Sequence, residues 1–272
     1  MIKRTVFFVS ESTGITAETL GHSLLSQFQD GVQFRIIYMP FISTEEKAHQ
    51  LAEQFRLLTE AEGVRPIVFA TMAESGLRHI LEDSSCFYIE VFDTFISPLS
   101  KELGMSPSGI VGLSHGMVNG ETYEDRMSII NFAVVNDDGA RLDKYEHADV
   151  ILVGVSRSGK TPTCLYLAMH FGLKAANYPI TEEDFEKDKL PEVLIQNREK
   201  ILALTIDPVR LNRIREERRP GSPYASLGRC YSEVKKAGRM FKHYNLHVFD
   251  TTSRSIEEVS SRIVKRIQSL KA

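Results

Sequence analysis

The first third of the chain alternates short apolar runs with stretches of helical periodicity. Apolar runs predict buried strands at Thr5 to Val9, Phe34 to Met39, Pro66 to Ala70 and Ser85 to Phe92. Between these runs, Ile15 to Phe28 has helical spacing, and Ser43 to Glu46 supplies the cap and first-turn acids of a helix. Apolar strands that alternate with helices predict a parallel sheet in residues 1–95.

The alternation returns near the middle of the chain. Further strands are predicted at Val150 to Val153, Ala175 to Pro179, Ile201 to Ile206 and His247 to Asp250. Helices are predicted at Leu211 to Arg219, Ser232 to Tyr244 and Ile256 to Leu270, and Thr181 to Asp184 is either a helix start or an exposed turn. A second α/β domain is therefore expected.

A phosphate-loop motif joins the strand at Val150 to Val153 to a helical segment. Its residues are Gly154, Val155, Ser156, Arg157, Ser158, Gly159, Lys160 and Thr161, which fit G-x-x-x-x-G-K-[ST] at every fixed position. The glycines let backbone N–H groups face phosphate oxygens, Lys160 supplies a charge, and Thr161 supplies a hydroxyl ligand for Mg²⁺. We predict that these residues bind a nucleotide; a chance glycine-rich turn is the alternative.

The segment between the two alternating regions has a different character. Ser97-Pro98, Ser106 to Gly109 and His115 to Gly120 are rich in turn residues, and a helix from Tyr123 to Val135 is stopped by Asn136 to Gly139. We predict an α/β fold with an N-terminal parallel-sheet domain (1–95), a connecting or active-site segment (96–148), and a C-terminal P-loop nucleotide-binding domain (149–272).

Composition and charge narrow the choice of partners. The apolar fraction of 42% is ordinary for a globular protein. The net charge of −3 gives no general basic field, so nucleic acid is not expected as a partner. The N-terminal apolar run is too short for a signal peptide, and no window of the sequence is apolar for the ~18 residues of a membrane span. The three cysteines lack metal-ligand or disulfide spacing. A cytoplasmic protein with reduced thiols is expected.

Several acids and one histidine are candidates for chemistry. Asp207 ends an apolar strand, which is the form of an acid that supports Mg²⁺ beside a phosphate loop. Asp137 and Asp138 lie between a helix end and the strand that leads to the loop, where a solvated turn is the alternative to a catalytic role. His115 is more simply a loop histidine than a catalyst.

Two other segments could bind anions. Arg213, Arg215 and Arg218 lie close together on one predicted helix and are candidates to bind phosphate, with a solvated helix face as the alternative. The turn from Ser10 to Gly14 repeats the order of strand, small-residue loop and helix, but it lacks the lysine and the second glycine of a phosphate loop. It is more simply a structural turn, although its position would suit a ligand.

Several motifs together resemble the bacterial phosphoenolpyruvate synthase regulatory proteins, a family shared with the regulators of pyruvate phosphate dikinase. The motifs that carry this resemblance are Gly154 to Ala168, Ala175 to Pro179, Leu204 to Pro208, Ile214 to Arg219 and Tyr224 to Leu227. The likeness extends back through Asp137 to Gly139 and Thr16 to Glu18 as far as Val6, and so covers nearly the whole chain. This sequence departs from the family pattern at Glu11 to Gly14, where many relatives have Asp-Gly-Thr, and matches it loosely at 181–200.

The resemblance implies a bifunctional enzyme that acts on phosphoenolpyruvate synthase as its protein substrate. One activity would phosphorylate a serine or threonine of the target with ADP as donor; the other would remove that phosphate with inorganic phosphate and release pyrophosphate. Mg²⁺ would be required. With the resemblance added, Lys160 and Arg157 become catalytic candidates, and a base or metal-positioning role is expected for Asp137 or Asp138.

Other functions remain open at the level of the sequence. The target could be pyruvate phosphate dikinase, with the same chemistry. The phosphate loop alone would also fit a small-molecule kinase or a non-catalytic nucleotide-sensing switch. The sequence leaves a homodimer open.

Overall fold

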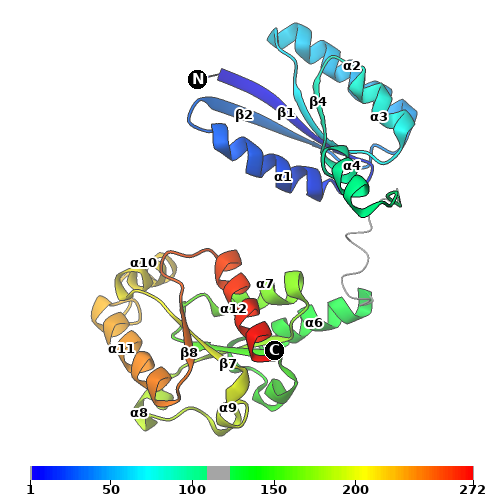
Figure 1. Ribbon diagram of the computed structural model, residues 1–272. Coiled ribbons are helices and arrows are strands. Elements are labelled where there is room, and N and C mark those ends of the chain that lie inside the picture. Colours follow the sequence, from blue (N-terminus) through cyan, green and yellow to red (C-terminus); the bar gives the residue numbers. More distant parts are fainter. Residues whose placement is uncertain (1, 109–122, 272) are drawn as a thin grey trace. The chain divides into compact units, whose positions relative to one another are not determined.

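The computed structural model describes residues 2–108 and 123–271 of the chain. The chain divides into two compact units, Met1–Val118 and Asn119–Ala272. Each unit contains a four-stranded, fully parallel sheet with helices packed against it (Figure 1). The predicted α/β fold class is therefore confirmed.

In the first unit the strands lie in the order β2-β1-β3-β4. The strands are β1 (Ile2–Ser10), β2 (Val32–Met39), β3 (Ile67–Thr71) and β4 (Phe87–Glu90). The helices are α1 (Ile15–Leu25), η1 (Ser26–Phe28), α2 (Glu45–Glu62), α3 (Ser75–Glu82) and α4 (Val91–Leu103). Since β1 pairs with both β2 and β3, the chain leaves the sheet at the end of β1 from a central position.

The central strand β1 is buried on both faces of the sheet. Its successive side chains point to opposite faces, and each face packs on helices. Phe7 packs on Phe55 of α2 with ring centroids 4.9 Å apart. Phe8 belongs to a separate apolar cluster that includes Ala17 of α1. The continuous apolar run that predicted this strand thus reflects helices on both sides of the sheet.

Two predictions of secondary structure in the first unit differ from the structure. The strand predicted to run to Phe92 ends at Glu90, and the turn predicted at Ser97-Pro98 lies inside α4. Pro98 lacks an N–H group, which removes one helical hydrogen bond, but its fixed φ is compatible with a helix. Apolar residues at helical spacing outweigh this loss. The predictions for Gly109 and for His115 to Gly120 lie outside the described residues.

The second unit repeats the strand order of the first, as β6-β5-β7-β8. Its strands are β5 (Val150–Gly154), β6 (Ala175–Pro179), β7 (Ile201–Thr205) and β8 (His247–Asp250). Its longer helices are α6 (Tyr123–Val135), α7 (Lys160–Phe171), α10 (Pro208–Arg218), α11 (Leu227–His243) and α12 (Ile256–Lys271). Short helices complete it: η2 (Asp137–Gly139), η3 (Leu142–His147), α8 (Glu182–Lys187), α9 (Glu192–Gln196) and η4 (Arg198–Lys200).

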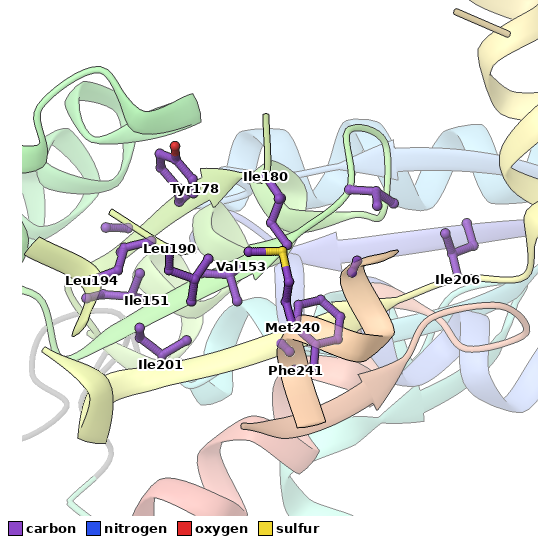
Figure 2. Close-up of a cluster of buried hydrophobic side chains, with 14 of the residues drawn as sticks. Ile151, Val153, Tyr178, Ile180, Leu190, Leu194, Ile201, Ile206, Met240 and Phe241 are labelled. Carbon is purple, nitrogen blue, oxygen red and sulfur yellow. The ribbon is translucent and has the colours of Figure 1, made fainter. Parts of the chain in front are cut away.

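The sheet of the second unit is also covered on both faces. Ile151 and Val153 of β5 join the cluster that includes Met240 and Phe241 of α11 (Figure 2). The alternating residues of β5 pack on the opposite face, in a cluster with residues of α7 and α12. This packing fixes the end of β5, where the phosphate loop begins.

The helices offer no candidate for a membrane span. Within residues 2–108 and 123–271, none combines the length and the apolar character that crossing a bilayer requires.

Candidate functional site

The phosphate loop, Val155–Gly159, connects β5 to α7. Because β5 pairs with β6 on one side and β7 on the other, the loop leaves the carboxyl end of a central strand. Ligands bind at this place in open parallel sheets, where connections to the two sides diverge. The predicted order of strand, loop and helix is confirmed, with Lys160 as the first residue of α7.

Both glycines of the motif have a structural reason. A Cβ on Gly154 would lie 2.5 Å from the carbonyl oxygen of Leu204 in β7, closer than real contacts allow. Gly159 has φ +91°, a left-handed conformation that L side chains rarely adopt, and it is the N-cap of α7. Arg157 is also left-handed, with φ 73°, and its side chain is exposed at the loop. The two glycines of the motif are therefore required by the path of the loop backbone.

Lys160 follows the loop directly, and its side chain is buried, with 4% exposed. Its Nζ donates a hydrogen bond to the backbone oxygen of Val155 at 3.0 Å. Burial lowers the pKa of Lys160 to about 8, although the negative charges of Asp138 and Asp137 act in the opposite direction. An amine that is desolvated in this way gains strongly from a phosphate, which returns a counter-charge to it. Lys160 is thus suited to hold a phosphoryl group.

Asp137, one of the two predicted aspartates, contacts Thr161 beside the loop. The Thr161 hydroxyl donates to Oδ1 of Asp137 at 2.7 Å, and the amide Nδ2 of Asn177 donates to the same oxygen. Asp138 follows with φ 48°, and its backbone N–H donates to Oδ1 of Asn177 at 3.2 Å. The adjacent acids therefore belong to the phosphate-loop site, and the side chain of Asp138 is exposed there.

Asn177 was missed by the sequence reasoning. It lies in the middle of β6, is 0% exposed, and orients both aspartates through its side-chain amide. Its backbone oxygen accepts a hydrogen bond from the hydroxyl of Tyr145 at 2.6 Å. A polar amide inside an otherwise apolar strand was the available signal, because a buried amide requires partners.

Asp207, the predicted Mg²⁺ ligand at the end of a strand, caps a helix in the structure, and its role toward Mg²⁺ stays a prediction. Its Oδ1 accepts hydrogen bonds from the backbone N–H groups of Val209 and Arg210, both at 3.0 Å, so Asp207 is the N-cap of α10. Pro208 occupies the first turn that follows. An acid before a proline is a typical helix start as well as a strand end. The carboxylate that contacts Thr161 is Asp137.

The predicted arginine cluster divides into exposed and buried members. Arg213 and Arg218 are exposed on α10. The prediction that Arg215 binds phosphate is wrong for the side chain as it lies: it is 0% exposed, donates to the backbone oxygens of Ser156 and Tyr224, and pairs with Glu233 at 2.6 Å. Helical spacing turns this one residue inward, beneath the loop.

The oxygen atoms beside the loop fit Mg²⁺. This ion prefers one or two protein oxygens, with substrate phosphates and water completing its shell, and the Thr161 hydroxyl and Asp137 carboxylate provide such a pair. A closed protein cage is not present: among the described residues, no group of three or more His, Cys, Asp and Glu side chains could hold a metal. The donor set thus fits an ion that arrives with a nucleotide.

A cavity of about 850 Å³ lies elsewhere on the second unit. Its lining includes Ala148, Ile201 and His247, which are at or next to the amino ends of β5, β7 and β8. The phosphate loop is at the carboxyl end of β5. Parallel sheets bind ligands at their carboxyl ends, so the loop remains the candidate site.

Comparison with known proteins identifies the family of the chain. The sequence profile of the kinase/pyrophosphorylase family matches residues 6–264. A protein of Thiocapsa roseopersicina is 56% identical over 98% of both chains, and one of Marinobacter nauticus is 48% identical over 97% of both. A protein of Pseudomonas aeruginosa is 49% identical over 97% of this chain and 96% of its own.

These relatives carry the provisional name phosphoenolpyruvate synthase regulatory protein. Among solved structures, a periplasmic sugar-binding protein from Legionella pneumophila covers 98% of this chain and 86% of its own with a TM-score of 0.19 and 10% identity, which carries no argument. The sequence matches extend over both units and include the phosphate loop. The chain therefore belongs to the kinase/pyrophosphorylase family.

Proposed function

We propose that this protein regulates phosphoenolpyruvate synthase by reversible phosphorylation. In one direction it transfers the β-phosphoryl group of ADP to a serine or threonine of the target enzyme and inactivates it. In the other it uses inorganic phosphate to remove that group, releases pyrophosphate and restores activity. Family membership and the relatives' names support the class of function and the target, and a cytoplasmic location fits the three free cysteines.

The observation that carries the proposal is the buried Lys160 within a phosphate loop, beside two carboxylates. In such a loop the lysine reaches the β-phosphate of a nucleotide. In ADP this phosphate is terminal and therefore transferable. The loop would then hold the group that moves rather than a spectator phosphate.

In the kinase direction, the hydroxyl oxygen of the target attacks the β-phosphorus of ADP in line. The bond from this phosphorus to the bridging oxygen breaks, and AMP leaves with the electron pair. The hydroxyl proton passes to a carboxylate, for which Asp138 is suited because its side chain is exposed at the site while Asp137 already accepts two hydrogen bonds. Mg²⁺, when bound at Thr161 and Asp137, would neutralise charge on the phosphates.

In the reverse direction, an oxygen of inorganic phosphate attacks the phosphorus on the target. The bond to the serine or threonine oxygen breaks, pyrophosphate forms, and the released oxygen takes back a proton from the same carboxylate. Arg157 is exposed at the loop and could hold the attacking phosphate. Both directions thus use one loop and one proton carrier.

The decisive experiment identifies substrates and products together. Purified protein is incubated with Mg²⁺, ADP and phosphoenolpyruvate synthase, and the target is analysed by mass spectrometry while AMP is quantified. A phosphorylated serine or threonine with an equal amount of AMP is expected, followed by pyrophosphate release when phosphate replaces ADP. Phosphorylation of pyruvate phosphate dikinase and not of the synthase would show that the dikinase is the target. Transfer to small molecules alone would indicate a small-molecule kinase. Nucleotide binding without any transfer would indicate a nucleotide-sensing switch.

A further inference from the structure

Two side chains from outside the phosphate loop hold its backbone in place. We propose that Arg215 of α10 and Thr251, the residue after β8, are positioning residues that aim the backbone N–H groups of the loop at a bound phosphate. The inference rests on the proposed nucleotide site, and it concerns how that site is kept ready for its ligand.

Arg215 fixes the carbonyl that precedes Arg157. Its Nη2 donates to the backbone oxygen of Ser156 at 3.0 Å. Tyr224 adds a second contact to the same residue, because its hydroxyl lies 2.8 Å from the hydroxyl of Ser156. The backbone and the side chain of Ser156 are therefore both attached to residues outside the loop.

Thr251 contacts the carbonyl of Ser158, in the second peptide group after Arg157. Its Oγ1 lies 3.1 Å from the backbone oxygen of Ser158 and 3.0 Å from that of Thr205 in β7, so its single hydrogen is shared between the two carbonyls. The hydroxyl therefore connects the loop to the carboxyl end of the sheet. The carbonyls of Ser156 and Ser158 are thus held by side chains from different elements.

Holding a carbonyl also aims the next N–H group. A trans peptide is planar, so its C=O and the following N–H point in opposite directions. The contact of Arg215 with Ser156 thereby directs the N–H of Arg157 away from Arg215, and that of Thr251 with Ser158 directs the N–H of Gly159 away from Thr251. Among the described residues, these two N–H groups have no hydrogen-bond acceptor. Free backbone N–H groups in a loop are what an anion-binding site presents.

The loop conformation needs such support because Arg157 is left-handed at φ 73° without being glycine. A strained conformation of this kind persists only where its surroundings determine it. The hydrogen bond of Arg215 acts on the peptide group that precedes the strained residue, and that of Thr251 acts on the peptide group between Ser158 and Gly159. They favour the strained form in the free protein, so a ligand does not have to create it.

Arg215 is itself held firmly enough to act as a support. Its guanidinium stacks over the ring of Tyr224 at 4.2 Å and pairs with Glu233 at 2.6 Å. Glu233 also accepts a hydrogen bond from Arg229 at 2.7 Å. A planar guanidinium can serve several fixed acceptors at once, which a lysine ammonium in the same place cannot do with the same geometry.

The sharpest test uses Thr251, where substitutions of similar size differ in one donor. Thr251→Val removes the hydroxyl and Thr251→Ser retains it. Calorimetric titration with ADP, and separately with inorganic phosphate, at fixed Mg²⁺ should show Kd raised about three- to tenfold by Thr251→Val for both ligands, as expected for one lost hydrogen bond. Thr251→Ser should bind as the wild type does.

Thr252→Val is the matched control. The Thr252 hydroxyl bonds the backbone N–H of Asp207 and the carboxylate of Asp250, and so does not hold the loop. This variant should lower the melting temperature about as much as Thr251→Val does, while leaving both Kd values unchanged. A purely structural role for Thr251 would instead give the two variants the same binding.

Arg215→Lys provides a second test that keeps a positive charge beside Glu233. It should raise Kd for ADP and for phosphate by about tenfold or more, since the contact with Ser156 and the stacking on Tyr224 are lost together. If Arg215→Lys does not fold, the Thr251 pair decides alone. Wild-type binding by folded Thr251→Val, or equal losses in Thr251→Val and Thr251→Ser, would overturn the inference and leave the proposed function standing. A wild-type protein that binds neither ligand would overturn both.

Discussion

The loops that follow β1 and β5 occupy the same position in two sheets of the same strand order. Each leaves the carboxyl end of a strand with partners on both sides, and each ends in a left-handed glycine that is the N-cap of a helix. These glycines are Gly14, with φ 80°, and Gly159, with φ 91°. Both loops therefore have the backbone setting in which anions are commonly bound.

The loops after β1 and β5 differ in their side chains. The first residue of α1 is Ile15, which is 51% exposed, whereas the first residue of α7 is the buried Lys160. The carbonyls of the first loop are bonded by the backbone of its own unit, where Ile42 donates to Ser10 and Phe41 donates to Ser12. The topology supplies a place for a ligand, but a cation and adjacent acids are needed to make that place a candidate for phosphoryl transfer.

The largest predicted effect comes from the residue at the start of each helix. Lys160→Ala should lower kcat/KM in both directions by on the order of 100- to 1,000-fold, because a charge-assisted contact to the transferred phosphoryl group is lost. Ile15→Ala, at the corresponding place of the first unit, should leave both rates unchanged. Rates with ADP and with phosphate as co-substrate measure this. A large loss in Ile15→Ala would give the first loop a part in the chemistry.

The acids beside the loops should give the next largest difference. Asp138→Asn should lower both rates by roughly 100-fold without recovery at high Mg²⁺, as expected for loss of a proton carrier. Asp137→Asn should lose activity that added Mg²⁺ partly restores. Glu11→Gln is the counterpart in the first loop, where the carboxylate accepts the backbone N–H of Glu74 and should not affect rate. Identical Mg²⁺ profiles for the two aspartate variants would contradict the division between them.

The glycines of the two strand ends should differ in their effect on stability. Gly154→Ala places a methyl group 2.5 Å from the backbone oxygen of Leu204 and should cost about 2–3 kcal/mol of unfolding free energy together with activity. Gly14→Ala meets no atom closer than 3.6 Å, so the left-handed strain alone should cost about 1 kcal/mol and leave activity intact. Denaturant unfolding compares the two. Equal losses of unfolding free energy would mean that β7 shifts to accommodate the added methyl group.

The smallest predicted effect separates the two phosphate donors. Arg157→Gln should raise KM for inorganic phosphate about tenfold, the value of a charge-assisted hydrogen bond, and change KM for ADP much less. Arg218→Gln, on the exposed face of α10, is the companion variant for the predicted phosphate-binding cluster. Equal losses for ADP and phosphate would indicate one shared anion site. No loss in either variant would return these arginines to solvated surface positions.

The sequence predicted the central strands of the second unit well because they are buried on both faces. Val150 to Val153 and Ile201 to Ile206 are apolar enough to be recognised without knowledge of their partners, and the observed strands begin at the same residues. The phosphate loop was also predictable, since the glycines, the lysine and the threonine of its motif are close together in sequence. Local sequence patterns therefore predict where the candidate site lies.

The residues that surround the loop could not be predicted from local sequence patterns. Asn177, Tyr224 and Thr251 reach the site from separate elements, and their roles depend on which strands become neighbours. Arg215 and Asp207 show a second limit of local patterns, because residue types that suit phosphate or metal binding also form a buried ion pair and a helix cap. Residue type alone does not distinguish such uses.

Hydrogen–deuterium exchange with and without ADP tests most directly whether the loop after β5, and not the loop after β1, binds the nucleotide. With Mg²⁺ present, ADP should slow exchange of the backbone amides of Val155–Gly159 and the first turn of α7, because these N–H groups become donors to phosphate. Exchange in the Ser10–Gly14 loop should be unchanged. Protection of Ser10–Gly14 by ADP, or unaltered exchange at Val155–Gly159 under saturating ADP, would contradict the account.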